Sequence, residues 1–412
     1  MPIGFAKSIL TGGAGTGVDW ANWDGSKDST ITVSSLTNST DYGRWLGFCD
    51  FNDDYGLAFG IENQSGGTND DIVYAKIQNS GDTLTYSGQA VHFTTSSSSW
   101  TNEQGAILKT NGGNIWATFN AGSLDSRVYS ISGSTVTQHT AFAEQFYTNQ
   151  NSTMFRQPGS NVYANCNTMP QGELSTLVDN GDSSSNASVP ITQLRNPSGA
   201  GGMYYFSSSY IVPGFVDQDT PIRLQSATSP ESGDSGDTGI PVTMDLTSTG
   251  TGQVEGTFAG LSAATFNVES STNVVEWAYS CTPPFPTTDF NDRLLLIERQ
   301  GSGGVLRMTN YKSGDTSYSQ TTLTDAEIPS GDTQMNGIFV GPDNTIFLFN
   351  QMDETEEEIW IYRYNTVTNV LEKVLSVDNG EGFNQVRCKL CRWGNDRAVL
   401  MYNDNKIRLL VP

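Results

Sequence analysis

A chain of 412 residues is long enough for two average domains or for one large all-β domain. Acidic residues outnumber basic ones 44 to 21, which gives a formal net charge of −23. That excess argues against a nucleic-acid-binding protein, because little positive charge is present to neutralise phosphates, and it disfavours insertion into or binding to anionic membranes for the same reason.

Residues 1–28 are predicted to form an N-terminal docking arm. The opening stretch reads MPIGFAKSILTGGAGTG, in which Phe5, Ile9 and Leu10 supply apolar side chains ahead of a glycine-rich tether. The apolar run is too short for the core of a secretory signal or for a transmembrane helix, which needs about 20 residues. The alternatives are that residues 1–28 are disordered or pack on the chain's own body, with Trp20 and Trp23 pinning the segment.

The rest of the chain alternates short apolar runs with Gly, Asn, Asp, Ser and Pro, which is typical of strands joined by tight turns. One unit recurs: an apolar strand, a polar turn and a second apolar strand, as in FCDFNDDYGLAFGIEN and IFVGPDNTIFLFNQ. A second strand pair follows most copies, so the unit is a four-stranded meander of about 50 residues, the pattern of a β-propeller. The second strands are expected to start near Leu57, Ile115, Val162, Ile211, Leu294, Ile346 and Ala398.

The two ends of the chain are predicted to meet in one blade. The last copy has only three strands, whereas residues 29–36 (STITVSSL) form a strand with no blade of its own. Pairing this strand with the last blade would close the ring and protect open edges. Residues 29–412 are therefore predicted to form an all-β propeller of seven four-stranded blades. Six or eight blades remain alternatives, and residues 247–264 are expected to be an insertion between blades.

The first turn of the first blade is a candidate calcium loop. Asp50, Asn52 and Asp54 alternate oxygen ligands, as loops that bind hard cations do. The downstream glutamate of an EF-hand is missing, and other copies have plain hairpin turns at this position. An ordinary turn is therefore favoured over a weak calcium site, and no other cofactor is expected.

Tryptophans outside the central strands are candidates for stacking on sugars. Trp45 and Trp100 are predicted to contact a glycan or a host surface. Tryptophans inside strands are expected to pack between blades.

No catalytic constellation stands out. Residues 232–237 (SGDSGD) resemble the nucleophile loop of chymotrypsin-like proteases, but that serine needs a histidine base. The chain's two histidines, His92 and His139, fall in outer strands of the first two blades. Cys388 and Cys391 have CxxC spacing without the second half of a zinc site. The chain is therefore predicted not to be an enzyme.

The opening MPIGFAKSILT resembles the openings of virion structural proteins of marine tailed bacteriophages, which begin with such a peptide ahead of unrelated β-rich bodies. The resemblance covers residues 1–11 and implies a structural virion protein, anchored through its arm to the tail or head. Its implied partners are other virion proteins and copies of itself in an oligomer or symmetric array, with host-surface glycan as a further contact. The alternative is a free propeller that binds or cleaves carbohydrate.

Overall fold

The computed structural model describes residues 18–33, 44–63, 70–94, 105–140, 334–351, 358–378 and 389–412, with a few residues left out of the last four ranges. Between residues 153 and 322 it describes the strands as backbone. The described strands form seven four-stranded sheets, and each pairing is antiparallel. The one described helix is the short 3-10 turn η1 (Trp20–Asn22). The prediction of an all-β chain built from four-stranded antiparallel sheets is confirmed.

The first six sheets are meanders whose strands follow one another in chain order. Sheet 1 contains β2 (Arg44–Asp50), β3 (Tyr55–Asn63), β4 (Asp70–Ser80) and β5 (Thr83–Thr94). Sheet 2 contains β6 (Gly105–Lys109), β7 (Ile115–Asn120), β8 (Leu124–Ser132) and β9 (Thr135–Gln138). Sheet 3 contains β10 (Thr153–Arg156), β11 (Val162–Cys166), β12 (Glu173–Val178) and β13 (Ile191–Gln193).

Sheet 4 contains β14 (Ile211–Phe215), β15 (Pro221–Ala227), β16 (Thr238–Thr243) and β17 (Thr257–Phe258). Sheet 5 contains β18 (Val275–Cys281), β19 (Arg293–Gln300), β20 (Leu306–Lys312) and β21 (Ser319–Thr322). Sheet 6 contains β22 (Gln334–Val340), β23 (Ile346–Gln351), β24 (Glu358–Asn365) and β25 (Val370–Asp378).

The seventh sheet, called here the closing sheet, joins both ends of the chain. It contains β26 (Lys389–Trp393), β27 (Arg397–Tyr402), β28 (Lys406–Leu410) and, on the free edge of β28, β1 (Ser29–Thr32). In the register of this pair, Ser29 lies opposite Leu409 and Thr32 opposite Lys406. This is the pairing predicted for residues 29–36, of which 34–36 lie outside the described residues.

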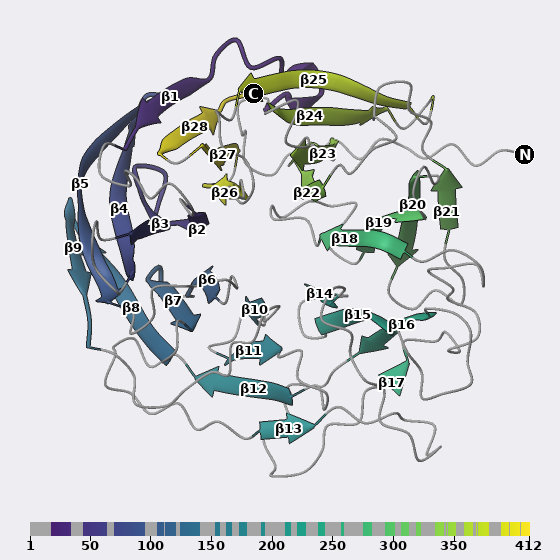
Figure 1. Ribbon diagram of the computed structural model, residues 1–412, viewed down its shortest axis with the longest axis horizontal. Helices are drawn as coiled ribbons and strands as arrows, with labels where there is room; N and C mark the ends of the chain where they lie inside the picture. The colour runs from purple at the N-terminus through teal and green to yellow at the C-terminus, as the bar shows by residue number, and fades with distance from the viewer. Residues whose placement is uncertain are drawn as a thin grey trace, which may run out of the picture.

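The sheets follow one another around a ring in a propeller-like arrangement (Figure 1). The first strands of successive sheets contact each other in the order β2, β6, β10, β14, β18, β22 and β26, and β26 contacts β2. These strands lie nearest the middle of the ring, and the fourth strands lie on its outside (Figure 1).

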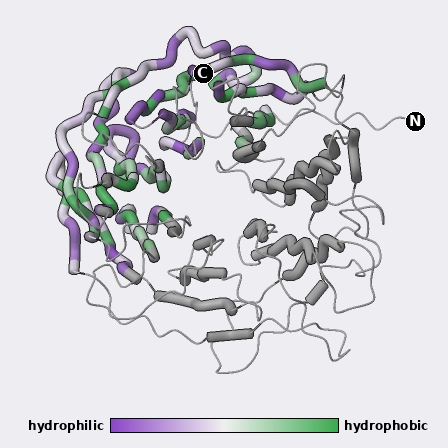
Figure 2. The backbone as a smooth tube through the Cα atoms, viewed as in Figure 1, coloured by the Kyte–Doolittle hydropathy of each residue, from purple (hydrophilic) through white to green (hydrophobic). Residues whose placement is uncertain are grey.

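The described hydrophobic core lies between neighbouring sheets. One cluster fills the space between sheet 1 and the closing sheet, a second lies between the closing sheet and sheet 6, and a third joins sheets 1 and 2. Strands covered on both faces are apolar almost throughout, as in β27, whereas the outer strand β9 alternates exposed and half-buried residues. In Figure 2 the green, hydrophobic stretches lie mostly on strands nearer the middle of the ring.

Sheet 4 differs from its prediction in two places. The strand expected to be its second, near Ile211, is its first strand β14, and β15 follows as the second. Residues 257–258, expected to belong to an insertion between blades, form the outermost strand β17. For residues 257–258 the expectation of an insertion at 247–264 is therefore wrong. The sequence did not reveal this strand, because two residues are too few to show an alternating pattern.

Candidate functional site: the seam between the two ends of the chain

Residues 18–23 pack against sheet 6. Trp20 and Trp23 are both almost fully buried. The ring centroid of Trp20 lies 5.3 Å from that of Phe339 and 5.7 Å from that of Phe347. The ring centroids of Trp23 and Phe347 are 5.6 Å apart. Gly341 makes room for this packing, because a Cβ there would lie 2.9 Å from the Trp20 ring. The segment 18–23 is thus part of the body, as the alternative interpretation of the arm proposed.

Polar contacts fix the same segment in place. Asp19 caps η1, since its Oδ1 accepts a hydrogen bond from the Asn22 amide at 3.2 Å. The Ala21 amide donates to Asp343 Oδ2 at 3.1 Å, and Arg363 donates to the Ala21 carbonyl. The predicted boundary of a free arm at residue 28 therefore falls inside a packed segment, whereas Phe5, Ile9 and Leu10 lie outside the described residues.

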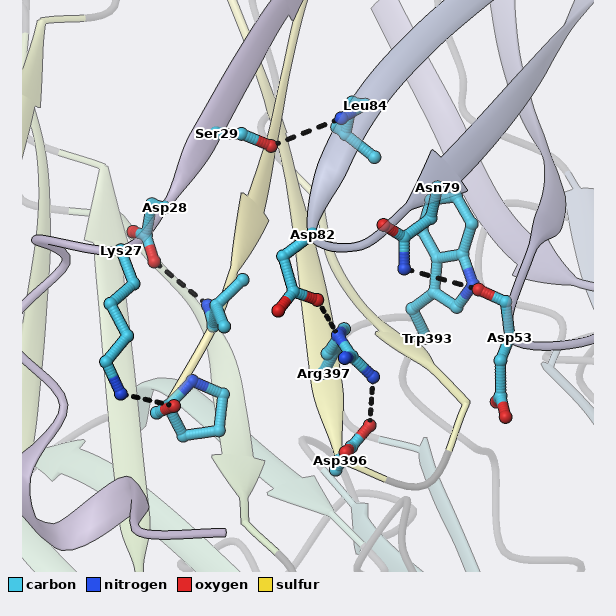
Figure 3. Close-up of polar contacts among 12 residues, drawn as sticks. Lys27, Asp28, Ser29, Asp53, Asn79, Asp82, Leu84, Trp393, Asp396 and Arg397 are labelled. Carbon is cyan, nitrogen blue, oxygen red and sulfur yellow. Dashed lines mark hydrogen bonds and ion pairs between the residues drawn. The ribbon is translucent and has the colours of Figure 1, made fainter.

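Asp28 is the centre of the contacts between the two chain ends (Figure 3). Its carboxylate is buried and accepts hydrogen bonds from the Val411 amide at 2.9 Å and from Trp23 Nε1 at 3.0 Å. Arg408 Nε lies 2.8 Å from Asp28 Oδ2. Lys27 Nζ donates to the carbonyl of Pro412 at 3.1 Å. A single carboxylate therefore joins the segment before β1 to the segment after β28.

A second set of contacts joins the closing sheet to sheet 1 (Figure 3). The turn between β4 and β5 places Asp82 in the left-handed region, at φ 65°, and its carboxylate lies 2.5 Å from Arg397 Nε. Arg397 also pairs with Asp396 at 2.7 Å. The Leu84 amide donates to Ser29 Oγ at 3.4 Å. The last and first sheets are therefore held by charge as well as by their shared core.

The turn between β2 and β3 belongs to this seam. Trp393 Nε1 donates to the carbonyl of Asn52 at 3.0 Å. Asn79 donates to the carbonyl of Asp53 at 3.3 Å (Figure 3). Gly394, at φ 61°, lies directly over Asp53, because a Cβ there would lie 2.4 Å from the Asp53 carboxylate. The turn is thus held by the ends of two neighbouring sheets.

The structure does not bring together the predicted calcium ligands. Asp50 is buried and its carboxylate lies 2.7 Å from Lys109 Nζ, which already balances its charge. Asn52 Oδ1 accepts hydrogen bonds from the amides of Asp54 and Tyr55 and so closes the hairpin turn. The described residues hold no group of three or more His, Cys, Asp or Glu side chains placed to bind a metal ion. The weak calcium prediction is therefore wrong for this turn.

The predicted contact residue Trp45 belongs to the core. It is 1% exposed, and its Nε1 donates to the carbonyl of Asn403 at 2.8 Å. Its prediction as a surface residue is therefore wrong, because β2 is an inner strand covered by the closing sheet. Trp100 lies outside the described residues. Trp116 and Trp393 are buried within their strands, as predicted.

One polar cluster was not predicted, and it lies between sheets 1 and 2. His92 belongs to β5, and Asp125 and Tyr129 belong to β8. His92 Nε2 lies 3.1 Å from Asp125 Oδ1, and His92 Nδ1 shares a hydrogen bond with the Tyr129 hydroxyl. Arg127 Nε pairs with Asp125 at 2.6 Å. In β5 the pairing skips His92, since Val91 and Phe93 lie opposite the adjacent residues Val73 and Ile72, so a bulge turns His92 into the interface.

The protonation states in this cluster follow from burial. Burial lowers the pKa of His92, although the hydrogen bond to Asp125 opposes this. Burial would raise the pKa of Asp125, but hydrogen bonds from His92 and Arg127 lower it overall. Burial also raises the pKa of Tyr129. A neutral His92 can therefore accept from the Tyr129 hydroxyl at Nδ1 while its Nε2 lies beside the Asp125 carboxylate.

This arrangement has the connectivity of a catalytic triad with tyrosine in the position of the nucleophile. The His92 side chain is 0% exposed and that of Asp125 is 7% exposed, so a substrate has no access to it. The cluster therefore joins sheets 1 and 2. The signal in the sequence was the alternation Asp125, Arg127, Tyr129, which puts all three side chains on one face of a strand.

The other reactive groups considered from the sequence form no site in the part of the chain that the structure describes. The serine run 232–237 and Cys388 lie outside the described residues. Cys391 and Cys49 are free thiols, and burial raises the pKa of both. His139 Nε2 and Ser130 Oγ share a hydrogen bond of 2.8 Å on the outside of sheet 2. No helix in the described part of the chain is long and apolar enough to cross a membrane.

Comparisons with known proteins find no matching family model and no matching curated protein. Among solved structures the chain is similar to YCF48 bound to a D1 peptide (10% identity, 93% of this chain and 94% of that chain, TM-score 0.47). It is also similar to the periplasmic gluconolactonase PpgL of Pseudomonas aeruginosa (10% identity, 80% and 83%, TM-score 0.48). A third is the α-L-arabinofuranosidase Arb93A of Fusarium graminearum (9% identity, 75% and 92%, TM-score 0.45).

These comparisons correct one prediction. The exclusion of an enzyme from the lack of a recognisable motif is wrong, because two of these three similar structures are named as enzymes, a gluconolactonase and an arabinofuranosidase. At 9–10% identity and TM-scores below 0.5, the same likenesses assign no activity, substrate or partner to this chain.

Proposed function

We propose that this chain is a structural component of a tailed-phage virion. In this proposal the sheets are the seven blades of a propeller closed by β1, and residues before the seam attach the propeller to the tail or head. The attached ring would present its loops to solvent, to neighbouring copies or to a host surface.

The observation that carries the proposal is the firm attachment of residues 18–28 to the body. Trp20, Trp23 and Asp28 bury this segment against sheet 6 and the closing sheet. A peptide that precedes this segment is therefore joined to the packed body of the protein. The residues before the anchor include the apolar Phe5, Ile9 and Leu10.

Short apolar peptides suit this role for a physical reason. They can occupy a groove or add a strand to a neighbour's sheet, where main-chain hydrogen bonds supply affinity. Copies repeated around a symmetric particle multiply such weak contacts. The resemblance of residues 1–11 to virion proteins agrees with this proposal.

The experiment measures whether two variants of the N-terminal peptide are incorporated into particles. The first lacks residues 1–12, and the second is the full chain with Phe5, Ile9 and Leu10 replaced by serine. Mass spectrometry of purified particles should find the wild-type protein in stoichiometric amounts and neither variant. Circular dichroism and urea unfolding of both variants should match the wild type, because the seam begins at residue 18. Incorporation of either folded variant at the wild-type level would contradict the proposal.

The same experiment decides about the alternative. If particles lack the wild-type protein and it occurs free in solution, carbohydrate binding or cleavage becomes the first hypothesis. A glycan array and hydrolysis assays on the isolated protein would then test it, with Trp100→Ala as the variant expected to lose binding. A clean array at high protein concentration would argue against that alternative.

A further inference from the structure

One surface of the closing sheet and sheet 6, called here the groove, is covered by an extended stretch of the same chain. It has three parts: the edge of β28 that pairs with β1, the surface that Phe339, Gly341 and Phe347 offer to Trp20, and the guanidinium of Arg408. In this structure the groove holds residues 18–33 of the same chain, here called the closing segment. The occupant makes strand pairing, aromatic contacts and a buried ion pair at once.

The contacts of residues 18–28 described above all go to one another or to residues 339–412. The next residues, Ser29–Thr32, pair with β28, and the Val33 amide donates to the carbonyl of Asn405 at 2.7 Å. The body therefore recognises the closing segment through side chains and backbone that the segment carries itself. The chain between the segment and β2 is residues 34–43, which fall outside the described residues. Ser29 of the segment also accepts the hydrogen bond from the Leu84 amide of sheet 1.

We propose that the groove also binds the closing segment of a second copy, so that neighbouring copies exchange these segments. Ten linking residues span at most about 33–36 Å when extended. Linkage within one chain gives an effective concentration in the millimolar range, so exchange requires copies held close together. This inference rests on the proposed function for that crowding alone, because a symmetric array would supply it.

The structure offers a matched pair of positions for detecting exchange. Thr32 and Lys406 lie opposite each other in the β1–β28 pair, and neither is buried. A Thr32→Cys full chain would donate its segment, and a Lys406→Cys full chain would accept it. A disulfide forms only between residues whose Cα atoms lie about 4.4–6.8 Å apart, so linkage reports the native register. The mismatched control replaces Thr30, which lies opposite Arg408, instead of Thr32.

The two full chains are mixed over a series of concentrations, oxidised and run on a non-reducing gel, and each variant alone gives the background. We expect a disulfide-linked dimer that increases with concentration and exceeds that of the mismatched pair, whose Cα atoms lie farther apart. The double variant carrying both cysteines should link within one chain at low concentration, which shows that the pair is competent to react.

A control on the rate uses Gly341, whose substitution by alanine would push a methyl group into the seat of Trp20. Gly341→Ala weakens the hold of a groove on its own segment and on a foreign one alike, so it should shorten the time to reach the final amount of dimer without reducing that amount. No dimer when the double variant reacts would overturn the proposal. If a variant fails to fold, unmodified tagged and untagged full chains incubated together at high concentration should co-purify, and their failure to do so would overturn it as well.

This test uses purified protein and does not depend on particles. Exchange without incorporation would refute the virion role alone. Incorporation without exchange would refute this inference alone.

Discussion

Replacing Asp28 by alanine should weaken the seam, because it removes the acceptor at its centre. The substitution removes the acceptor for Arg408, for the Val411 amide and for Trp23 Nε1. Each hydrogen bond to a charged group contributes about 1.5–3 kcal/mol. Removal of one partner from a buried ion pair costs about 3–5 kcal/mol.

The Arg408 side chain retains 18% exposure and can recover part of its hydration, so we expect the lower end of that range, a loss of about 3 kcal/mol. Urea unfolding measures the loss as a lower midpoint at an unchanged slope. Asp24→Ala is the matched control in the same segment, because Asp24 is exposed and its hydrogen bonds go to the neighbouring Ser26. That variant should unfold almost like the wild type.

A loss below about 1 kcal/mol, the range of exposed ion pairs, would refute the reasoning. It would mean that water replaces the carboxylate at Arg408 and Val411, and that the aromatic contacts alone hold the segment. Equal losses for Asp24→Ala and Asp28→Ala would refute it too, because burial would then not matter.

Three other substitutions test the contacts between sheets, each by urea unfolding. Burial keeps the pKa of His92 below its ordinary value, so the unfolded chain takes up a proton that the folded protein resists. Stability should therefore fall as the pH drops below about 6.5, and His92→Gln should flatten that fall. Gly341→Ala crowds Trp20 and should lower the free energy of unfolding by about 1–3 kcal/mol. Gly112→Ala should lower it little, because the nearest atom to the new Cβ would be Thr110 Oγ1 at 3.7 Å. Trp45→Ala should cost about 3–5 kcal/mol through a core cavity, and unchanged stability would restore Trp45 as a surface residue.

The strands of this fold could be predicted because each is a local pattern. The copies around Leu57, Ile115, Ile346 and Ala398 alternate apolar residues between turn-forming ones, and the structure has strands there. The three-stranded last copy and the unpartnered strand at residue 29 together predicted the β1–β28 pair. Sheet 4 was assigned less well, because its strands are interrupted by Pro and Gly.

The contacts between strands could not be predicted in the same way. Whether Trp45 faces solvent or a neighbouring sheet depends on which strand covers β2, and that strand comes from the far end of the chain. His92 enters the interface because of a bulge in β5, which shifts its side chain off the alternating pattern. Asp50 alternates with Asn52 and Asp54 as a calcium loop would, but Lys109 on the next sheet takes its charge.

The sharing of one sheet by β1 and β28 has a consequence for synthesis. Residues 29–32 are synthesised more than 370 residues before their partners in β28. The early strand must wait with its edge unpaired while the sheets between are built, and Trp20 and Trp23 wait for sheet 6. Pairings of such long sequence separation form slowly. The nascent chain therefore remains open to proteases and chaperones at least until residues 406–410 have left the ribosome, because only then can β1 pair with β28.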